Sequence, residues 1–333
     1  MKLIIPMAGR GTRVRPHSHT IPKPLLPVAG TMIIERIVET FSRTLDQTID
    51  EIVYILGPDF GSEIRERLVE MSDRHHAEST FRVQEEALGT AHAVFCADQD
   101  LTGEVIIVFA DTIFDSKEKV SLQGADSVIW LKKVDDPSRF GVAVYDDDTI
   151  TDFVEKPDTP ISDLAIIGVY YFKQGGDLKK EIKYLLDNNI TGHGGEFQLT
   201  DALDRMLKGG KTFMKATVDE WLDCGTLPAW LETTGFILEK ENHPYDAQAY
   251  ADSTIHPPVY IGKDVKITKS EIGPNVSIED GTVIENSTVS HTIIQENAAI
   301  KDSRLEKSSI GNNAQVEGQR GTVHLGDHSI VRQ

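Results

Sequence analysis

The chain has 333 residues, of which 39% are hydrophobic and 26% charged, and this ordinary mixture excludes a largely disordered protein. Its formal net charge of −19 argues against a nucleic-acid-binding protein, because phosphate backbones are bound by basic surfaces. The two cysteines, Cys96 and Cys224, predict neither a disulfide framework nor a zinc site. The length favours two domains, since single cores seldom exceed about 250–300 residues.

The first 240 residues alternate short apolar runs with stretches of helical spacing. Strands are predicted at 3–7, 52–56, 80–84 and 105–109, and helices at 31–45, 62–71 and 91–97. This rhythm predicts an α/β fold, a Rossmann-like mixed, mainly parallel sheet with helices on both faces and ligands at the carboxyl ends of its strands. Further strands are predicted at 127–134, 141–145, 150–154 and 165–172, and further helices at 178–188, 199–208 and 227–239.

After about residue 245 an aliphatic residue recurs every five or six positions, from Ile255 to Val316. Neither a helix nor simple alternation has this period, whereas a parallel β-helix of hexapeptide turns does. Three steps make a coil of 16 or 17 residues, so we expect about four coils. A sandwich of short strands is the alternative. The predicted domains are therefore 1–243 and 244–333.

The strand at Leu3–Met7 ends in a glycine loop, from Ala8 and Gly9 to Gly11, Thr12 and Arg13. Backbone N–H groups of such a loop can surround phosphate oxygens, although one glycine loop alone is often a plain turn. The cations Arg13 and Lys23 favour the phosphate interpretation, and the Gly-Lys-Ser/Thr ending of a Walker A loop is absent.

Three polar residues follow other predicted strands. Gln84 precedes Gly89 and Thr90, and its amide can both donate to and accept from the edge of a nucleobase. Asp111 lies at the end of a buried strand, and Asp223 lies in Trp221-Leu222-Asp223-Cys224-Gly225-Thr226. Two separated carboxylates suit Mg²⁺, which completes its coordination with water and substrate phosphates. Each residue alone could equally be a turn, cap or strand-end residue.

These motifs together resemble the sugar-1-phosphate nucleotidyltransferases, or sugar-nucleotide pyrophosphorylases. The signature Gly-x-Gly-Thr-Arg, followed by Pro and Pro-Lys-Pro-Leu-x-Pro, matches 9–27, and later motifs keep the family's order to about residue 240. The chain departs from the pattern at Ala8, where bacterial thymidylyltransferases usually have glycine, and at Ala110 and Thr112, which replace glycine and asparagine.

The resemblance implies a role for each matching residue. The catalytic cations would be Arg13 and Lys23, and Asp111 and Asp223 would hold Mg²⁺. The nucleotide would be bound by the glycine loop and by the Gln84 motif: Ala8, Gly9, Gly11, Thr12, Arg13, Gln84, Gly89 and Thr90. The sugar phosphate would be bound by Gly141, Glu155, Lys156 and Tyr170. The motif Glu196-Phe197-Gln198-Leu199-Thr200-Asp201 also matches the family.

The implied activity is an in-line attack of a sugar 1-phosphate on the α-phosphate of a nucleoside triphosphate, with Mg²⁺ and release of pyrophosphate. A pyrimidine nucleotide, dTTP or UTP, and glucose 1-phosphate are favoured. A left-handed β-helix, a cytoplasmic homo-oligomer and no nucleic-acid or membrane partner are also expected. The alternatives are a catalytically silent sugar-nucleotide-binding subunit, an N-acetylglucosamine-1-phosphate uridylyltransferase with acetyltransferase activity in its β-helix, and a mannose-1-phosphate guanylyltransferase.

Overall fold

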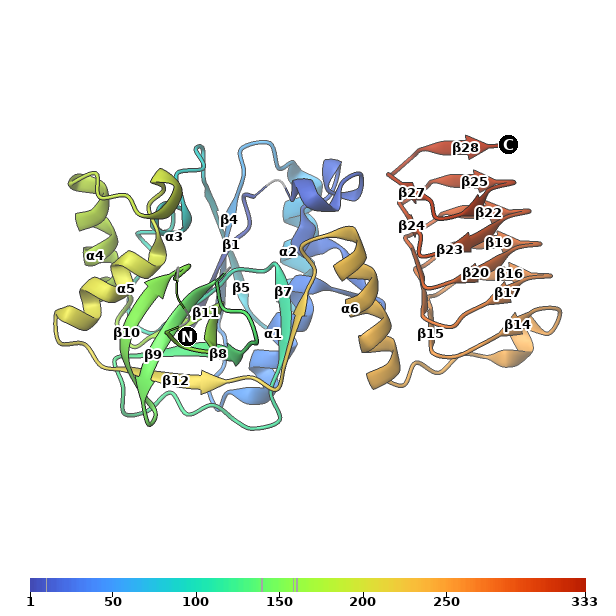
Figure 1. Cartoon of the computed structure of the whole chain (residues 1–333). Coiled ribbons are helices and arrows are strands. Elements are labelled where there is room, and N and C mark those ends of the chain that lie inside the picture. The colour runs from blue at the N-terminus through green and yellow to red at the C-terminus, as the bar shows by residue number, and fades with distance from the viewer. Residues whose placement is uncertain (10, 139, 158, 160) are drawn as a thin grey trace. The chain divides into compact units, whose positions relative to one another are not determined.

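The computed structural model describes residues 1–9, 11–138, 140–157, 159 and 161–333. The chain forms two compact units (Figure 1). The first, here called the sheet unit, comprises Met1–Gly9 and Ile37–Trp221, and the second, the β-helix unit, comprises Arg10–Arg36 and Leu222–Gln333. The β-helix unit therefore contains a segment from near the N-terminus as well as the C-terminal repeats. Each unit is described by itself below.

The sheet unit is built on a mixed sheet of nine strands within the described residues, in the order β5-β4-β1-β6-β11-β8-β12-β10-β9. The first four of these strands are parallel neighbours, and β12 is parallel to β8. The sheet strands are β1 (Lys2–Pro6), β4 (Glu51–Leu56), β5 (Glu78–Val83), β6 (Val105–Val108), β8 (Ser127–Lys133), β9 (Gly141–Asp146), β10 (Thr149–Glu155), β11 (Leu164–Phe172) and β12 (Phe213–Thr217).

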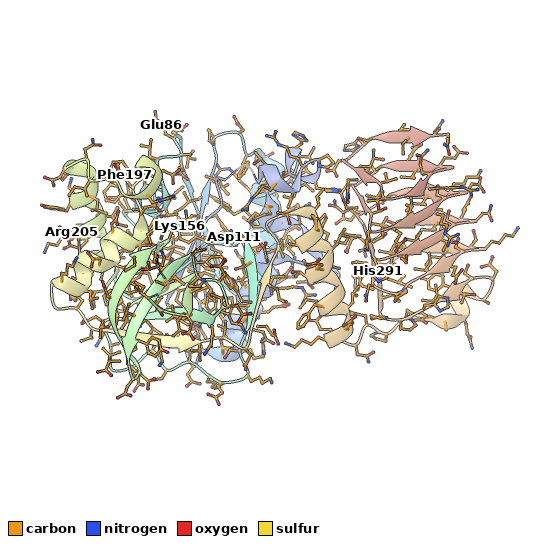
Figure 2. The ribbon with its side chains drawn as sticks, in the orientation of Figure 1. Glu86, Asp111, Lys156, Phe197, Arg205 and His291 are labelled. Atoms are coloured by element: carbon orange, nitrogen blue, oxygen red, sulfur yellow. The ribbon has the colours of Figure 1, made fainter. Side chains whose placement is uncertain are left out.

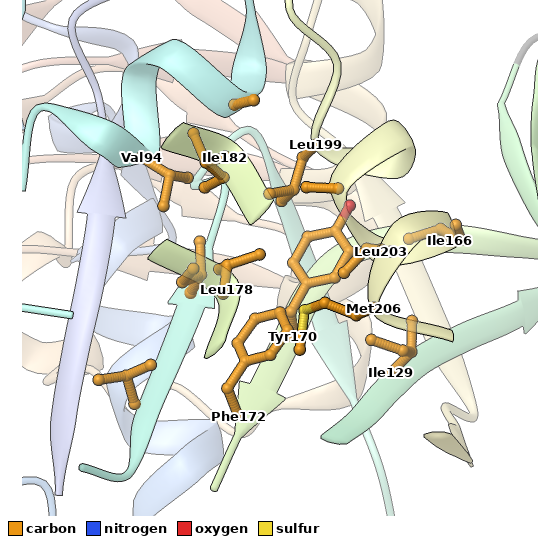
Figure 3. Packing of buried hydrophobic residues seen from close by; sticks show 14 of the residues in the cluster. Val94, Ile129, Ile166, Tyr170, Phe172, Leu178, Ile182, Leu199, Leu203 and Met206 are labelled. Atoms are coloured by element: carbon orange, nitrogen blue, oxygen red, sulfur yellow. The ribbon is translucent and has the colours of Figure 1, made fainter. Parts of the chain in front are cut away.

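Helices cover both faces of the sheet, as predicted. On one face, buried residues of three helices join the large core cluster with the strands: Val94 of α3, Leu178 of α4 and Leu203 of α5 (Figure 3). On the other face, the Phe41 ring of α1 meets the Trp130 ring edge to face at 6.2 Å. The helices are α1 (Ile33–Thr44), α2 (Ser62–Arg74), α3 (Thr90–Phe95), α4 (Gly175–Asp187) and α5 (Leu199–Lys208), with a 3₁₀ turn at His193–Gly195.

The predicted mixed sheet is confirmed: the strands of its first half are parallel neighbours, whereas the second half is largely antiparallel. β11 is antiparallel to both β6 and β8, and β10 is antiparallel to β12 and β9. β9 and β10 are joined by a tight turn in which Asp147 has φ 50°. Such short links allow only antiparallel neighbours, because a parallel pair needs a long crossover. The strands β7 (Thr112–Asp115), β12 and β13 (Glu220–Asp223) were not predicted.

The C-terminal repeats form a parallel β-helix of three sheets, each with five strands. Equivalent aliphatic residues stack in register, for example Ile267, Ile284, Ile300, Val316 and Val331. The strands are β14 (Thr254–Ile255), β15 (Val259–Ile261), β16 (Lys266–Thr268), β17 (Glu271–Ile272), β18 (Val276–Ile278), β19 (Val283–Glu285), β20 (Thr288–Ser290), β21 (Thr292–Ile294), β22 (Ala299–Lys301), β23 (Arg304–Glu306), β24 (Ser309–Ile310), β25 (Gln315–Glu317), β26 (Arg320–Gly321), β27 (His324–Leu325) and β28 (Ile330–Arg332).

The β-helix prediction is confirmed, but the stack has five coils where about four were expected. The fifth coil contains Gly321, Leu325 and Val331 at the stacking positions. Because Gly321 replaces the aliphatic residue, the sequence period is interrupted there. The stacked aliphatic side chains form a separate hydrophobic core inside the coils.

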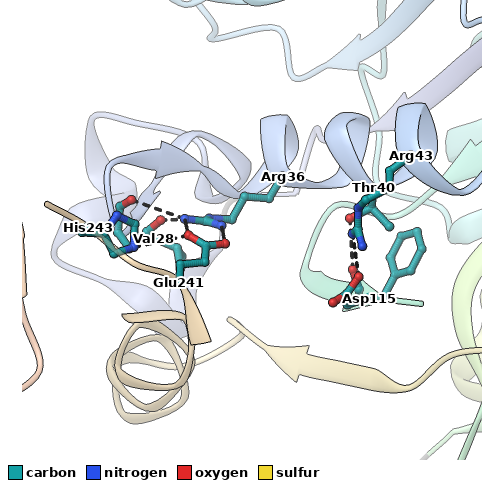
Figure 4. A network of polar contacts seen from close by, with 9 residues as sticks. Val28, Arg36, Thr40, Arg43, Asp115, Glu241 and His243 are labelled. Atoms are coloured by element: carbon teal, nitrogen blue, oxygen red, sulfur yellow. Dashed lines mark hydrogen bonds and ion pairs between the residues drawn. The ribbon is translucent and has the colours of Figure 1, made fainter. Parts of the chain in front are cut away.

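The N-terminal segment of the β-helix unit is irregular and is anchored by polar contacts. It contains 3₁₀ turns at Thr12–Val14, His17–His19 and Lys23–Leu25 and the short strands β2 (Pro27–Val28) and β3 (Thr31–Met32). The Trp230 indole of α6 (Leu227–Lys240) donates to the Pro27 carbonyl at 2.8 Å. Arg36 donates to the Val28 carbonyl at 2.9 Å and forms an ion pair with Glu241 at 2.7 Å (Figure 4). A further 3₁₀ turn spans Ala247–Tyr250.

Two further expectations concern cysteines and membranes. Cys96 and Cys224 are both free thiols, and Cys224 is fully buried. Among the described residues, no helix combines the length and apolar character that a membrane crossing requires.

Candidate active site

The glycine loop follows β1 directly, as predicted. In the sheet unit, the Met7 N–H donates to the Ile55 carbonyl at 2.9 Å and so extends the strand pairing up to Ala8. A Cβ placed on Gly9 would have no atom of another part of the described chain within 4 Å. The backbone at Gly9 therefore borders open space, which a ligand could approach closely.

Gly11, Thr12 and Arg13 lie in the β-helix unit, at the start of the 3₁₀ turn Thr12–Val14. Gly11 has φ 54°, in the left-handed region that favours glycine. Its carbonyl accepts hydrogen bonds from the Val14 N–H at 3.0 Å and from the Ser18 hydroxyl at 2.7 Å. These two bonds fold the loop back on itself, so the conformation of Gly11 depends on the turn that contains Ser18.

Lys23 lies beside the glycine loop, although it is twelve positions after Gly11 in the sequence. A Cβ on Gly11 would be 3.1 Å from the Lys23 Cβ, and Lys23 is only 9% exposed. The 3₁₀ turn Lys23–Leu25 is closed by a bond from the Leu26 N–H to the Lys23 carbonyl at 3.0 Å. The prolines on both sides restrict the backbone of this turn.

Arg13 and Asp223 meet at Gly225 in the β-helix unit, although they lie more than 200 positions apart in the sequence. The Gly225 N–H donates to Asp223 Oδ1 at 2.6 Å. A Cβ on Gly225 would lie 2.8 Å from Asp223 Oδ1 and 3.4 Å from Arg13 Nη2. A side chain at position 225 would therefore displace the Asp223 carboxylate from its present position. The structure thus places Lys23 beside Gly11, and Asp223 on the same side of Gly225 as Arg13, two residues after Gly11.

The Gln84 motif lies in the sheet unit, where β5 ends. The Gln84 N–H donates to the Leu56 carbonyl at 2.8 Å, and its side-chain amide is 3.4 Å from His92 Nδ1. Gln84 is only 9% exposed, so it is more buried than the exposed strand-end residue considered as the alternative. His92 therefore contacts the residue proposed to bind the base, a contact that the sequence did not predict.

Gly89 is held against the segment that contains Phe197, which sequence reasoning matched to the family without a structural role. Gly89 has φ 117°, and a Cβ there would be 2.5 Å from the Phe197 carbonyl oxygen. The Phe197 N–H donates to the Leu88 carbonyl and the Ala91 N–H to the Phe197 carbonyl, both at 2.9 Å. The Thr90 hydroxyl accepts from the Leu199 N–H at 2.9 Å. These hydrogen bonds thus join the Gln84 motif to the motif 196–201.

Glu155, Gly141 and Thr200 form a second cluster in the sheet unit. The Thr200 hydroxyl donates to Glu155 Oε2 at 2.9 Å, and a Cβ on Gly141 would approach the same oxygen at 2.9 Å. Lys156 has φ 43°, and its N–H donates to the Phe140 carbonyl at 3.1 Å. Its ammonium group lies 3.7 Å from Glu155 Oε1. Three of the four residues predicted for the sugar phosphate are therefore neighbours.

Tyr170 connects this cluster with Asp111. Burial raises the pKa of the Tyr170 hydroxyl, and the charges of Glu155 and Asp111 raise that pKa further. The Tyr170 ring meets the Phe109 ring edge to face at 6.3 Å, and the Asp111 N–H donates to the Phe109 carbonyl at 2.9 Å. Asp111 and Lys156 both belong to the sheet unit and are labelled in Figure 2. Tyr170 is thus a neutral hydrogen-bonding group beside two carboxylates.

Sequence reasoning gave no role to Thr200 or Asp201. Burial raises the pKa of the Asp201 carboxyl, and the charge of Glu155 adds to this effect. Asp201 thus shares the electrostatic environment of Glu155, to which Thr200 is hydrogen-bonded. The family match at 196–201 already includes both residues at its end. Only the fold shows that this motif lies next to Glu155.

Asp111 and Asp223 were predicted to bind Mg²⁺. Their carboxylate oxygens are the ligands that Mg²⁺ prefers, and Asp223 is exposed on the Arg13 side of the β-helix unit. Within the described residues, no group of three or more histidine, cysteine, aspartate or glutamate residues could hold a metal. Asp111 belongs to the sheet unit and Asp223 to the β-helix unit, and each supplies carboxylate oxygens of the kind that Mg²⁺ accepts beside phosphate and water.

Comparisons with known proteins identify the family of the chain. Residues 2–240 match the family model described as nucleotidyl transferase. A glucose-1-phosphate thymidylyltransferase of Streptomyces griseus is 27% identical over 99% of this chain and 98% of its own length. The low-salt glycan biosynthesis nucleotidyltransferase Agl11 of Haloferax volcanii is 31% identical over 95% of this chain and 94% of its own length.

The fold is shared with a solved UDP-glucose pyrophosphorylase complexed with UDP-glucose. That structure superposes with a TM-score of 0.58 and 23% sequence identity, covering 72% of this chain and 99% of the other. At this identity the likeness supports the fold, while the match of the family model over most of the chain establishes membership. The chain belongs to the nucleotidyl transferase family and is a sugar-1-phosphate nucleotidyltransferase with a C-terminal β-helix.

Proposed function

We propose that the protein joins a nucleoside triphosphate to a hexose 1-phosphate, with dTTP or UTP and glucose 1-phosphate as substrates. An oxygen of the sugar phosphate attacks the α-phosphorus in line with the bond to the β-phosphate. A new P–O bond forms as the α–β bond breaks, and pyrophosphate leaves with the electron pair. The grouping of Gly11, Arg13, Lys23 and Asp223 carries this proposal.

The main physical obstacle is the approach of two polyanions. Arg13 and Lys23 would offset this repulsion at the triphosphate, and Lys156 at the sugar phosphate, because preorganised charge costs no reorganisation during the reaction. Lys23 is well suited to this role because it is largely buried, and burial strengthens its field. The backbone N–H groups of the loop from Ala8 and Gly9 to Thr12 would hold the phosphate oxygens.

Asp111 and Asp223 would hold Mg²⁺ in the reacting complex. When bound, the ion would neutralise charge on the phosphates and orient them. The chain's own contribution is to hold the two carboxylates: the Gly225 N–H fixes Asp223 Oδ1, and the backbone bond from Asp111 to Phe109 fixes the turn after β6.

Specificity for the base and the sugar would lie in the sheet unit. Gln84, close to His92, would offer a donor and an acceptor to a pyrimidine edge, and Gly89 and Thr90, held by the segment at Phe197 and Leu199, would lie beside the base. Glu155, held by Thr200, would accept hydrogen bonds from sugar hydroxyls, and the neutral Tyr170 hydroxyl would line the same site with Gly141.

A pyrophosphate-release assay tests the proposal directly. The full chain is incubated with Mg²⁺, each of dTTP, UTP, CTP, GTP and ATP, and each of glucose, N-acetylglucosamine and mannose 1-phosphates. We expect the fastest release with dTTP or UTP and glucose 1-phosphate. Preference for GTP with mannose 1-phosphate would identify a guanylyltransferase, and binding without release would identify a silent sugar-nucleotide-binding subunit.

We also propose that the protein works as a cytoplasmic homo-oligomer. Ile330 of β28 is 59% exposed, next to Val331, which packs against the core of the coils, and contact with a second copy would cover this apolar side chain. Light scattering of the full chain tests this, with a monomeric mass as the contrary result.

A further inference from the structure

His17 is fully buried in the β-helix unit, between the glycine loop and the coils. It lies four residues after Arg13 and six before Lys23, in the 3₁₀ turn His17–His19. Its Nδ1 is 2.8 Å from the Gln295 side-chain amide nitrogen, and its Nε2 is 2.7 Å from the Ser309 hydroxyl. The imidazole also meets the Trp230 ring edge to face at 5.2 Å. A buried polar ring with both nitrogens bonded specifies one orientation.

The directions of these hydrogen bonds can be derived from a backbone anchor. The Glu296 N–H donates to Asn312 Oδ1 at 3.1 Å, so the Asn312 amide nitrogen is the atom that donates to Gln295 Oε1 at 3.3 Å. The Gln295 amide nitrogen must then donate to His17 Nδ1.

The remaining bonds follow from this assignment. Since Nδ1 accepts, the single proton of a neutral His17 is on Nε2 and is donated to the Ser309 hydroxyl, whose own proton goes to His324 Nδ1 at 2.8 Å. Burial, together with the charge of His324, lowers the pKa of His17 to about 4 against the opposing effect of Asp327, which agrees with a neutral ring.

The position of His17 is transmitted to the glycine loop through its neighbours. Ser18, the next residue, donates to the Gly11 carbonyl, and Thr20 donates to Asp327 Oδ2 at 2.6 Å. The turn His17–His19 is therefore bonded to the coils on one side and to Gly11 on the other. A shift of His17 would move Gly11, and with it Arg13.

A second contact holds the far end of the same segment. Glu279 is 7% exposed and accepts a hydrogen bond from the Ser277 hydroxyl at 2.8 Å. Its carboxylate also accepts from the Gly30 N–H, and the Tyr260 ring fills the space beside Gly30 where a Cβ would be. Lys23 thus lies between two points at which the segment is bonded to the coils.

We propose that His17 is a positioning residue for the triphosphate, and that the β-helix, through Gln295 and Ser309, sets the orientation of Arg13 and Lys23. The inference rests on the proposed function of these two cations. It gives the β-helix a part in the proposed nucleotidyl transfer, distinct from assembly into an oligomer and from an acetyltransferase activity.

The test compares Gln295→Ala and Ser309→Ala with a matched control in the full chain. Ser287→Ala is the control, because Ser287 is also a buried hydroxyl of the coils but bonds to coil backbone, to the Glu285 carbonyl at 2.7 Å and to the Ser303 N–H. We expect the KM for the nucleoside triphosphate to rise about tenfold in the first two variants. Each variant loses one buried hydrogen bond, so a smaller fraction of molecules has the glycine loop in the conformation that binds the triphosphate. The control should keep the wild-type KM, and the KM for the sugar 1-phosphate should change little.

Gln295→Glu supplies a signature that a general loss of stability would not give. A carboxylate cannot donate to Nδ1, so the ring can bond to it and still donate from Nε2 to Ser309 only after gaining a second proton. Asp327 and His324 also act on the pKa of this ring. The triphosphate KM of this variant should recover towards the wild-type value as the pH is lowered, whereas that of Gln295→Ala should not.

Calorimetric titration of the triphosphate, measured beside turnover, separates two kinds of failure. If the wild type releases no pyrophosphate with any substrate pair, the proposed function fails, and the affinities of the variants still test the inference. If wild type, Gln295→Ala and Ser309→Ala bind the triphosphate equally, or if Ser287→Ala weakens binding as much, His17 is not a positioning residue and the inference is wrong.

Discussion

The two units hold their candidate site residues in different ways. In the sheet unit, Gly89 and Glu155 are fixed by bonds to the α5 region, through Phe197 and Thr200, within one large core. In the β-helix unit, Arg13 and Lys23 lie on short 3₁₀ turns, and the turn between them is bonded to the coils through His17. The groups proposed to bind the base and the sugar are therefore held within the core of the sheet unit. The cations Arg13 and Lys23 belong to a segment that is held by bonds to the coils.

The largest expected effect is the loss of kcat/KM when Arg13 or Lys23 is replaced. Lys23→Ala and Arg13→Ala should each lower kcat/KM about 10²–10³-fold, because each removes a charge placed where negative charge develops. Steady-state kinetics of pyrophosphate release measure this. Lys119→Ala, at an exposed lysine of the sheet unit, is the control and should behave as wild type. Near-normal turnover in Lys23→Ala would remove that residue from the mechanism.

The next effect concerns Glu279, which anchors Gly30. Burial raises the pKa of its carboxyl from 4.5 to about 7, so the folded protein favours the protonated form. Glu279 therefore costs stability progressively as the pH rises from about 4.5 to about 7, and Glu279→Gln removes this cost. We expect the variant to gain up to about 3 kcal/mol in unfolding free energy relative to wild type across this window.

Denaturant unfolding at a series of pH values measures this difference. His17, with its pKa lowered to about 4, changes stability in the opposite direction, because a neutral buried ring favours the fold as the pH rises towards 6.5. Subtracting wild type from variant cancels the contribution of His17. A difference that does not change with pH would contradict the buried, protonated state of Glu279.

The smallest expected effect is on the preference among nucleoside triphosphates, when Gln84 is replaced. Gln84→Ala should reduce the preference for the favoured pyrimidine triphosphate about tenfold, because one or two hydrogen bonds to a base edge are lost. Ratios of kcat/KM for dTTP or UTP against the other triphosphates measure the preference. Glu86→Ala, at an exposed neighbour of the same loop, should leave the ratios unchanged (Figure 2). Equal loss for every base would assign Gln84 to structure instead of recognition.

The sequence predicted the elements whose side chains repeat with a clear period. The buried strands before Ala8 and Asp111, the helix after Gly89 and the aliphatic ladder of the coils were all placed to within a few residues. The period could not show which strands pair, so it did not indicate which part of the mixed sheet is antiparallel. It also could not count the fifth coil, because Gly321 carries no side chain to mark it.

The motifs located the candidate site residues but not their mutual contacts. Matching 196–201 to the family gave no reason to place Phe197 against Gly89 or Thr200 against Glu155, since both contacts depend on tertiary folding. The same holds for His17. Nothing in its local sequence indicates a partner 278 positions away, and only the fold shows that Gln295 bonds to it.

The two anchoring points of the N-terminal segment set a length for the coil stack. Gly30 is contacted by Tyr260 of the first coil and by Glu279, which follows β18 in the second. His17 is bonded to Gln295, which follows β21 in the third coil, and to Ser309 in the fourth, and Thr20 is bonded to Asp327 of the fifth. Repeats of this kind usually tolerate gain or loss of a whole unit. Here the gain or loss of a coil between residues 280 and 295 would change the distance between the coil residues that contact Gly30 and those that contact His17. The N-terminal segment could then no longer make both contacts. The number of coils in that interval is therefore constrained by the N-terminal loop as well as by the repeat itself.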